Sequence, residues 1–397
     1  VIRIVYDLVD YLYKNYSISI SIKEGQVILD TGVLKRRGKT IDLSRQVEGQ
    51  KKELEDLTYK PSAYRTFYVY EPKQRLIVAP NFRDSVIQHM IYNYIYDVFD
   101  RSFIYDSYGC RKLKGTHKAS ARLQNFMRKH SNDKYYLQLD IKNFFYSIDK
   151  NILFEKLYKG VQKSEYDNET KRRIIWLSKT IIYNDVTENY VFKGEKNGLK
   201  NIPPHKTLFG IPKHLGLPIG NLTSQFFANL YLNDFDHFVK RELKRKHYIR
   251  YVDDFVIFGD DKKELTDVKQ RIEEYLEQNL KLTLRGDHRL RAVNDGLDFL
   301  GYIIRPSHTL VRRRAVNGYK YKKARFLNRY EMHLMNNSPA FMPDKACQNQ
   351  ARLEEIKRFL SVQASFFGHI KHANSHNLKQ KVGNINDEKY IHAFLRY

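Results

Sequence analysis

Two adjacent acids, Asp253 and Asp254, lie in the middle of a largely apolar run from Ile249 to Phe258. Carboxylates are costly to bury unless a cation or hydrogen bonds compensate their charge. A β-hairpin with the acids at its turn explains their position, because strands account for the apolar residues on both sides. The alternative is a solvated turn, since Asp is a common turn residue.

A third acid ends another apolar segment. Residues 135 to 141 read Tyr-Tyr-Leu-Gln-Leu-Asp-Ile, which predicts a strand that ends at Asp140, with the carbonyl of Ile141 beside it. Three carboxylates on neighbouring strands form the oxygen ligand set that Mg²⁺ prefers. We therefore expect Asp140, Ile141, Asp253 and Asp254 to hold two Mg²⁺ ions, with Mn²⁺ able to substitute.

The segment Gly216 to Gln225, with the sequence Gly-Leu-Pro-Ile-Gly-Asn-Leu-Thr-Ser-Gln, predicts a turn that leads into a helix. Glycine there permits the backbone to approach a nucleotide closely. An ordinary capped helix start is an equally good interpretation of this segment alone.

The charge of the chain indicates a polyanionic partner. Its 397 residues include 70 Lys and Arg against 45 Asp and Glu, a formal net charge of +25. The 30 Tyr and 23 Phe suit base stacking among these cations, so nucleic acid is the leading partner class. An inert basic surface and a membrane-surface protein remain the alternatives.

Cysteine usage and hydropathy exclude other classes. The two cysteines, Cys110 and Cys347, belong to no metal-binding spacing, which argues against a zinc site and for a reducing compartment. No apolar run is long enough to cross a bilayer, and the first residues lack a signal-peptide pattern. The expectation is a cytoplasmic protein with no membrane partner.

In their order along the chain, these motifs resemble the reverse transcriptase family from about Arg65 to Leu378. The resemblance implies an α+β right-hand polymerase with fingers, a palm on an antiparallel sheet, and a helical thumb. The implied domains are an N-terminal extension, 1–64; fingers, 65–134; a palm with an insertion at 184–216, 135–306; and a helical thumb with a C-terminal tail, 307–397.

The resemblance also implies residue roles. Asp140, Asp253 and Asp254 match the catalytic acids, and Phe145 matches the bulky residue that excludes a 2′-hydroxyl. The other implied nucleotide-binding residues are Lys73, Arg75, Arg111, Ile219, Gly220 and Gln225. The implied primer grip is Phe299, Leu300, Gly301 and Tyr302, and the implied nucleic-acid backbone contacts are Arg312, Arg313 and Arg314. Each has an alternative role as a packing or solvated residue.

The form Leu217-Pro218-Ile219-Gly220 is similar to that of reverse transcriptases from bacterial diversity-generating retroelements, and to related enzymes of antiphage defence. This implies complementary DNA synthesis from a dedicated structured non-coding RNA, with dNTPs and a DNA or RNA primer. An accessory protein or a second copy of the chain would be further partners. The alternatives are a template-independent or protein-primed DNA polymerase and an inactive RNA-binding module of polymerase fold.

Overall fold

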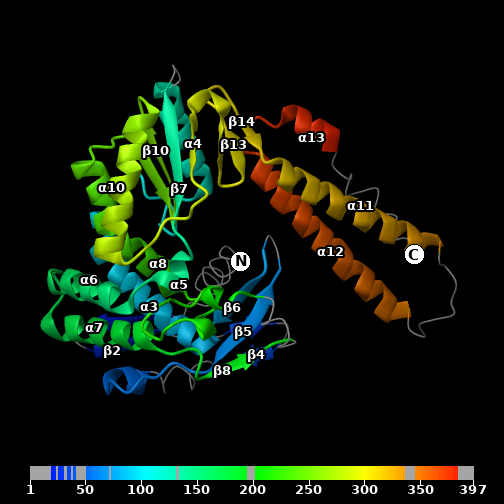
Figure 1. Cartoon of the computed structure of the whole chain (residues 1–397). Coiled ribbons are helices and arrows are strands. Elements are labelled where there is room, and N and C mark those ends of the chain that lie inside the picture. Colours follow the sequence, from blue (N-terminus) through cyan, green and yellow to red (C-terminus); the bar gives the residue numbers. More distant parts are fainter. Residues whose placement is uncertain are drawn as a thin grey trace. The chain divides into compact units, whose positions relative to one another are not determined.

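Figure 1 shows the computed structural model of the whole chain, which consists of two compact units. The first comprises Val1–Gly115 and Leu137–Leu290, and the second comprises Thr116–Tyr136 and Arg291–Tyr397. The structure describes residues 19–23, 26–30, 34–36, 39–41, 51–70, 73–130, 134–194, 202–335 and 345–382, with side chains from 51 onward except at 330–353.

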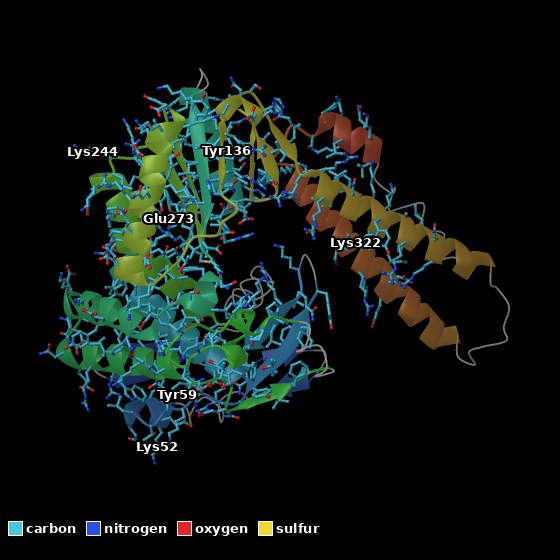
Figure 2. All side chains as sticks on the ribbon, viewed as in Figure 1. Lys52, Tyr59, Tyr136, Lys244, Glu273 and Lys322 are labelled. Atoms are coloured by element: carbon cyan, nitrogen blue, oxygen red, sulfur yellow. The ribbon has the colours of Figure 1, made fainter. Side chains whose placement is uncertain are left out.

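Near the N-terminus, the described backbone forms two antiparallel pairs of strands. β1 (Ser19–Lys23) pairs with β2 (Gln26–Asp30), and β3 (Leu34–Arg36) pairs with β4 (Lys39–Ile41). The segment that begins at residue 51 is joined to a later part of the same unit. The hydroxyl of Tyr59 donates to Asp84 Oδ1 at 2.9 Å (Tyr59 is labelled in Figure 2).

The central sheet has the strand order β11-β7-β10-β9. Its strands are β7 (Tyr135–Asp140), β9 (Tyr248–Tyr251), β10 (Asp254–Gly259) and β11 (Arg289–Ala292). β9 and β10 pair antiparallel with Tyr251 opposite Asp254, so Val252 and Asp253 form a two-residue turn. The predicted hairpin is confirmed, and so is the antiparallel sheet of an α+β fold.

A second sheet has the order β6-β5-β8. β5 (Tyr64–Val69) and β6 (Arg75–Ala79) form an antiparallel hairpin, and β8 (Tyr190–Phe192) adds to β5 in parallel. Because β8 lies within the insertion at 184–216, the first part of that insertion extends this sheet.

Helices cover these sheets, and their apolar patterns explain where they lie. Every residue of α8 (Leu222–Tyr231) is buried, including the polar Thr223, Ser224, Gln225 and Asn229. α10 (Lys262–Leu280) packs on β10 through one stripe at helical spacing: Leu265, Val268, Ile272, Leu276 and Leu280. The other long helices of this unit are α3 (Phe82–Phe99), α6 (Lys150–Gln162) and α7 (Asn168–Tyr183).

In its described residues, the second unit contains the sheet β12-β13-β14 and four α-helices. Its strands are β12 (Leu297–Phe299), β13 (Tyr302–Ile304) and β14 (Thr309–Val311). Its helices are α4 (Thr116–Lys129), α11 (Arg313–Met335), α12 (Lys345–Ile370) and α13 (His376–Val382).

α11 and α12 lie side by side and share an aromatic core (Figure 1). The ring of Tyr319 stacks on Phe366 at 4.1 Å between centroids, and Phe326 stacks on Phe359 at 4.3 Å. Lys322 of α11 borders the cavity between these helices (Figure 2). None of the helices that the structure describes has the length and hydropathy needed to cross a bilayer.

A buried ion pair stands beneath the β9–β10 turn. The Arg250 side chain is 0 % exposed and donates from Nε to Asp236 Oδ1 at 2.7 Å and from Nη2 to Asp236 Oδ2 at 2.5 Å. Its Nη1 donates to Asn229 Oδ1 and to the carbonyl of Val252. A bidentate pair with its remaining donors satisfied is the arrangement in which buried charges are tolerated.

The same residue joins other parts of the unit through its backbone. Arg250 N donates to the carbonyl of Asp106, and its own carbonyl accepts from Tyr108 N. Asp236 lies in the short helix α9 (Asn233–His237), which follows the end of α8. The chain turns at Leu232 between α8 and α9, and a π-helical turn, Phe238–Glu242, follows α9.

Replacement of Arg250 tests this ion pair. Arg250→Met leaves the Asp236 charge buried without its partner, so we expect the free energy of unfolding to fall by about 3–5 kcal/mol. Chemical denaturation followed by circular dichroism measures the loss. Arg172→Met removes an exposed ion pair with Glu169 and is the control, with a change of less than about 1 kcal/mol.

The double variant Arg250→Met, Asp236→Leu removes both charges together. It should recover most of the stability lost in the single variant, since a pair of apolar residues carries no desolvation cost. Equal stability of Arg250→Met and the wild-type protein would contradict the account.

Candidate active site

The turn that carries Asp253 has an unusual backbone. Val252 adopts φ +60°, a region that β-branched residues rarely enter. The carbonyl of Val252 is held by Arg250, and Gly109 packs against the residue so closely that a Cβ on Gly109 would lie 2.6 Å from Val252 Cγ2. Contacts on both sides thus maintain the turn.

Asp140 ends β7 beside this turn. Ile141 N donates to the carbonyl of Asp253 at 3.2 Å, which joins the end of β7 to the turn. The carboxylate of Asp140 forms an ion pair with Arg285, whose Nη1 lies 2.8 Å from Asp140 Oδ2. Arg285 N also donates to the Asp140 carbonyl, and its Nη2 lies 2.6 Å from Asp287 Oδ2.

Burial and mutual repulsion disturb the titration of the acids. Burial raises the pKa of Asp253 to about 6, and the charge of Asp140 adds to this shift. Burial also raises the pKa of Asp254 to about 7, with Asp140 and Asp253 adding to the shift and a hydrogen bond from Gln138 opposing it. Burial raises the pKa of Asp140 as well, although Arg285 acts against it. The three charges lie close enough to influence one another.

The donor chemistry of this site fits a divalent cation. The oxygens of buried, mutually repelling carboxylates are the ligands that Mg²⁺ prefers, and a cation would relieve the repulsion that raises their pKa values. Among the residues that the structure describes, no three acid, His or Cys side chains converge into a ready metal site. Arg285 engages Asp140 in this structure instead.

A cavity of about 450 Å³ lies beside the turn within the first unit. It is lined from five parts of the chain: the β5–β6 hairpin, the segment after β7, the end of the 184–216 insertion, the start of α8 and the turn that carries Asp253. It brings together seven of the predicted site residues: Lys73, Arg75, Phe145, Ile219, Gly220, Gln225 and Asp253. Asp140 and Asp254 are not among its lining residues.

The Pro/Gly-rich turn before α8 packs directly on β6. Gly220 has φ +146°, and a Cβ on it would lie 2.5 Å from the carbonyl oxygen of Val78. Val78 N donates to the carbonyl of Ile219 at 3.0 Å, so the turn and the strand are bonded. The glycine is needed for this close approach. Within the same wall, the thiol of Cys110 donates to Gln225 Oε1 at 3.3 Å.

Arg111 is engaged elsewhere in the first unit. Its Nε lies 2.7 Å from Asp100 Oδ1, and its Nη1 donates to the carbonyls of Ile104 and Ser107. The side chain is only 7 % exposed and does not line the cavity. A nucleotide-binding role for Arg111 stays a prediction.

The expected primer grip forms the β12–β13 turn of the second unit. Phe299 and Tyr302 are fully buried, whereas Leu300 and Gly301 form the turn with φ +53° and +93°. The hydroxyl of Tyr302 donates to the carbonyl of His369 at 2.8 Å. It also lies 3.1 Å from His117 Nδ1. Tyr302 therefore holds the turn to α4 through His117 and to α12 through His369.

The three arginines before and within α11 differ in their surroundings. Arg312 forms an ion pair with Asp298, and its backbone N donates to the carbonyl of Gly301. Arg313 and Arg314 are exposed at the start of α11. Their expected contacts with a nucleic-acid backbone stay predictions.

Sequence reasoning missed three residues of this region. Arg250 had a visible signal, because a lone cation inside an apolar strand requires a buried partner. Arg285 and Lys206 gave no signal in their spacing. Their positions beside Asp140 and in the cavity wall follow from tertiary contacts only.

Comparisons with known proteins identify the family of the chain. Residues 60–304 match the family model of the reverse transcriptases (RNA-dependent DNA polymerases). The chain therefore belongs to the reverse transcriptase family, and this membership confirms the predicted polymerase fold class. The division into fingers, palm and thumb at the stated boundaries stays a prediction.

Two curated bacterial relatives were found. Protein YkfC of Escherichia coli is 22% identical over 297 residues, which cover 66% of this chain and 70% of YkfC. The group II intron-encoded protein LtrA of Lactococcus lactis is 26% identical over 196 residues, 49% of this chain and 28% of LtrA. The match therefore spans little more than a quarter of LtrA.

Solved structures of two telomerases were also matched. The apo telomerase of Candida tropicalis has 13% identity and a TM-score of 0.45, and the match covers 75% of this chain and 64% of the telomerase chain. Telomerase of Candida albicans, in complex with a fragment of telomeric RNA, has 11% identity and a TM-score of 0.43 over 99% of this chain and 69% of its own.

The raised pKa of Asp254 predicts that ionisation of this residue costs the metal-free protein stability, to an extent that depends on pH. The folded state holds the proton up to about pH 7, whereas an unfolded Asp loses it near pH 4. Stability therefore falls as the pH rises through that window. Asp254→Asn removes the cost and should raise the free energy of unfolding at pH 8 by on the order of 1 kcal/mol.

Denaturation in EDTA at pH 4 and pH 8 measures this difference between the variant and the wild-type protein. Asp267→Asn, on the exposed face of α10, is the control and should change neither value. If the gain of Asp254→Asn were the same at both pH values, the raised pKa would be refuted.

Proposed function

We propose that this chain copies a structured RNA into complementary DNA, with Asp140, Asp253 and Asp254 as its catalytic acids. The observation that carries the proposal is the cavity that gathers seven predicted site residues beside the Asp253 turn. Membership of the reverse transcriptase family supports the same reaction class.

The three carboxylates and the carbonyl of Ile141 would hold two Mg²⁺ ions. When bound, such ions activate a primer 3′-hydroxyl and stabilise the pyrophosphate that leaves. The protein residues then bind and orient the reactants. Lys73 and Arg75, which line the cavity from the β5–β6 hairpin, would neutralise the triphosphate of a dNTP.

Phe145 would select deoxynucleotides. Its carbonyl accepts a hydrogen bond from Leu217 N at 2.8 Å, and its ring meets Phe144 edge to face at 5.7 Å. Since Phe144 is buried, these contacts fix the aromatic side chain at the cavity wall. A bulky ring held there would leave no room for a 2′-hydroxyl.

The template and the biological role form the finer part of the proposal. Ile219 and Gln225 line the same cavity, in the motif that resembles diversity-generating retroelement enzymes. We propose that they contact the templating base pair and permit errors at template adenines, with a dedicated non-coding RNA as template. The net charge of +25 supports a nucleic-acid partner of this kind.

Sequencing of the nucleic acid that copurifies with the protein tests this function. The protein is expressed from its native flanking DNA, beside Asp253→Ala. We expect DNA complementary to one RNA, with scattered changes at template adenines, and at least a hundredfold less DNA from the variant because a metal-binding acid is lost. Equal DNA from both proteins would refute catalysis by Asp253.

The other outcomes distinguish the role. Long or repetitive DNA that appears only on phage infection would replace the diversity-generating role by antiphage defence. DNA unrelated to any copurifying RNA would instead indicate template-independent synthesis.

Shortening of Phe145 tests the sugar selection. Phe145→Val opens space beside the nucleotide, so the ratio of kcat/KM for a dNTP over the matching rNTP should fall by about tenfold or more. Single-nucleotide primer extension measures both values. Tyr158→Val, at an exposed position away from the cavity, is the control. An unchanged ratio in Phe145→Val would show that another residue excludes the 2′-hydroxyl.

A further inference from the structure

The described end of the insertion, residues 202–216, is fastened to the segment that follows Asp140. Lys150 N donates to the carbonyl of His214, and Gly216 N donates to the carbonyl of Ile148 at 2.8 Å. The ammonium of the largely buried Lys150 donates to the carbonyl of Lys213 at 2.8 Å. These bonds attach the end of the insertion to the segment whose residues 143–146 line the cavity.

The part of the insertion that reaches the cavity is itself tightly folded. Pro204–Lys206 form one turn of 3₁₀ helix, and Thr207 N donates to the carbonyl of Pro204 at 3.1 Å. Gly210 packs on this turn so closely that a Cβ there would lie 2.5 Å from the Pro204 carbonyl oxygen. Thr207 and Ile202 are buried on either side. Lys206 is the last residue of this turn, so its side chain extends from a fixed backbone.

Lys206 is an exposed cation that lines the cavity. Its ammonium makes no hydrogen bond or ion pair with any residue that the structure describes, whereas the nearby Lys213 is engaged by Asp185 and Glu188. A cation beside a cavity without an acidic partner is available to an anionic ligand.

The charges around the cavity favour such a ligand. Among the residues that the structure describes, three cations line it, Lys73 and Arg75 from the β5–β6 hairpin and Lys206 from the insertion, against the single acid Asp253. Two separate parts of the chain therefore contribute positive charge to one cavity. Phosphate groups, which carry several oxygens and more than one charge, fit this arrangement.

We propose that Lys206 is a third phosphate-binding residue of the cavity, which holds the triphosphate of the incoming nucleotide together with Lys73 and Arg75. The proposal rests on the function proposed above. It assigns a role in substrate binding to the insertion, whose end at residues 213–216 is bonded to the segment after Asp140.

Steady-state primer extension with Lys206→Met tests the assignment. We expect the KM for the dNTP to rise about tenfold, the equivalent of about 1.4 kcal/mol, with a smaller change in kcat. Lys206→Arg, which keeps the charge, should restore most of the affinity. Lys193→Met is the control. It removes an exposed lysine of the same insertion, directly after β8, which does not line the cavity, and it should leave the KM unchanged.

Two results of the primer-extension assay would overturn the proposal. One is an unchanged dNTP KM in Lys206→Met. The other is a rise confined to the KM for primer and template, which would assign the lysine to a backbone phosphate instead.

A binding measurement separates this inference from the polymerase function. Calorimetry with inorganic tripolyphosphate requires no DNA synthesis, and Lys206→Met should weaken its binding while Lys193→Met should not. If the wild-type protein synthesised no DNA but still bound tripolyphosphate more tightly than Lys206→Met does, the proposed function would be refuted and the phosphate site would stand. Equal tripolyphosphate binding by wild type and Lys206→Met would refute the site itself.

Discussion

The buried pair of Arg250 and Asp236 is the interaction on which the arrangement of the site depends. One guanidinium binds Asp236, the Asn229 amide and the Val252 carbonyl, so it links α9, α8 and the Val252–Asp253 turn. Val252 needs this support because its backbone conformation is unfavourable for a β-branched residue. A buried ion pair adds little net stability. Here it holds one backbone geometry in place.

The site itself is a concentration of like charge in a region shielded from water. Burial and proximity raise the pKa values of Asp253 and Asp254 into the range of about 6 to 7, and Arg285 neutralises Asp140 from one side. Such a site costs stability when it is empty, and that cost favours a bound cation. The described residues that line the cavity beside it have the opposite balance, with three cations to one acid, which suits a triphosphate approaching these carboxylates.

The sequence was sufficient to predict the parts of the site that depend on local pattern. The apolar run around Asp253 and Asp254 predicted the hairpin of β9 and β10. Contacts between residues far apart in the sequence could not be predicted from local pattern. Asp140 and Arg285 pair across 145 positions, and Lys206 reaches the cavity wall only through the tertiary packing of the insertion. The ion pair of Arg250 with Asp236 was missed for the same reason, because its two partners come from different elements.

The measurement that tests the central claim most directly is incorporation of dNTPs by the wild-type protein on a defined RNA template with an annealed primer, as a function of divalent metal. The account predicts extension that follows the template sequence, requires Mg²⁺ or Mn²⁺, and stops in excess EDTA. Extension that continues without a divalent ion, or a product whose sequence does not depend on the template, would contradict it.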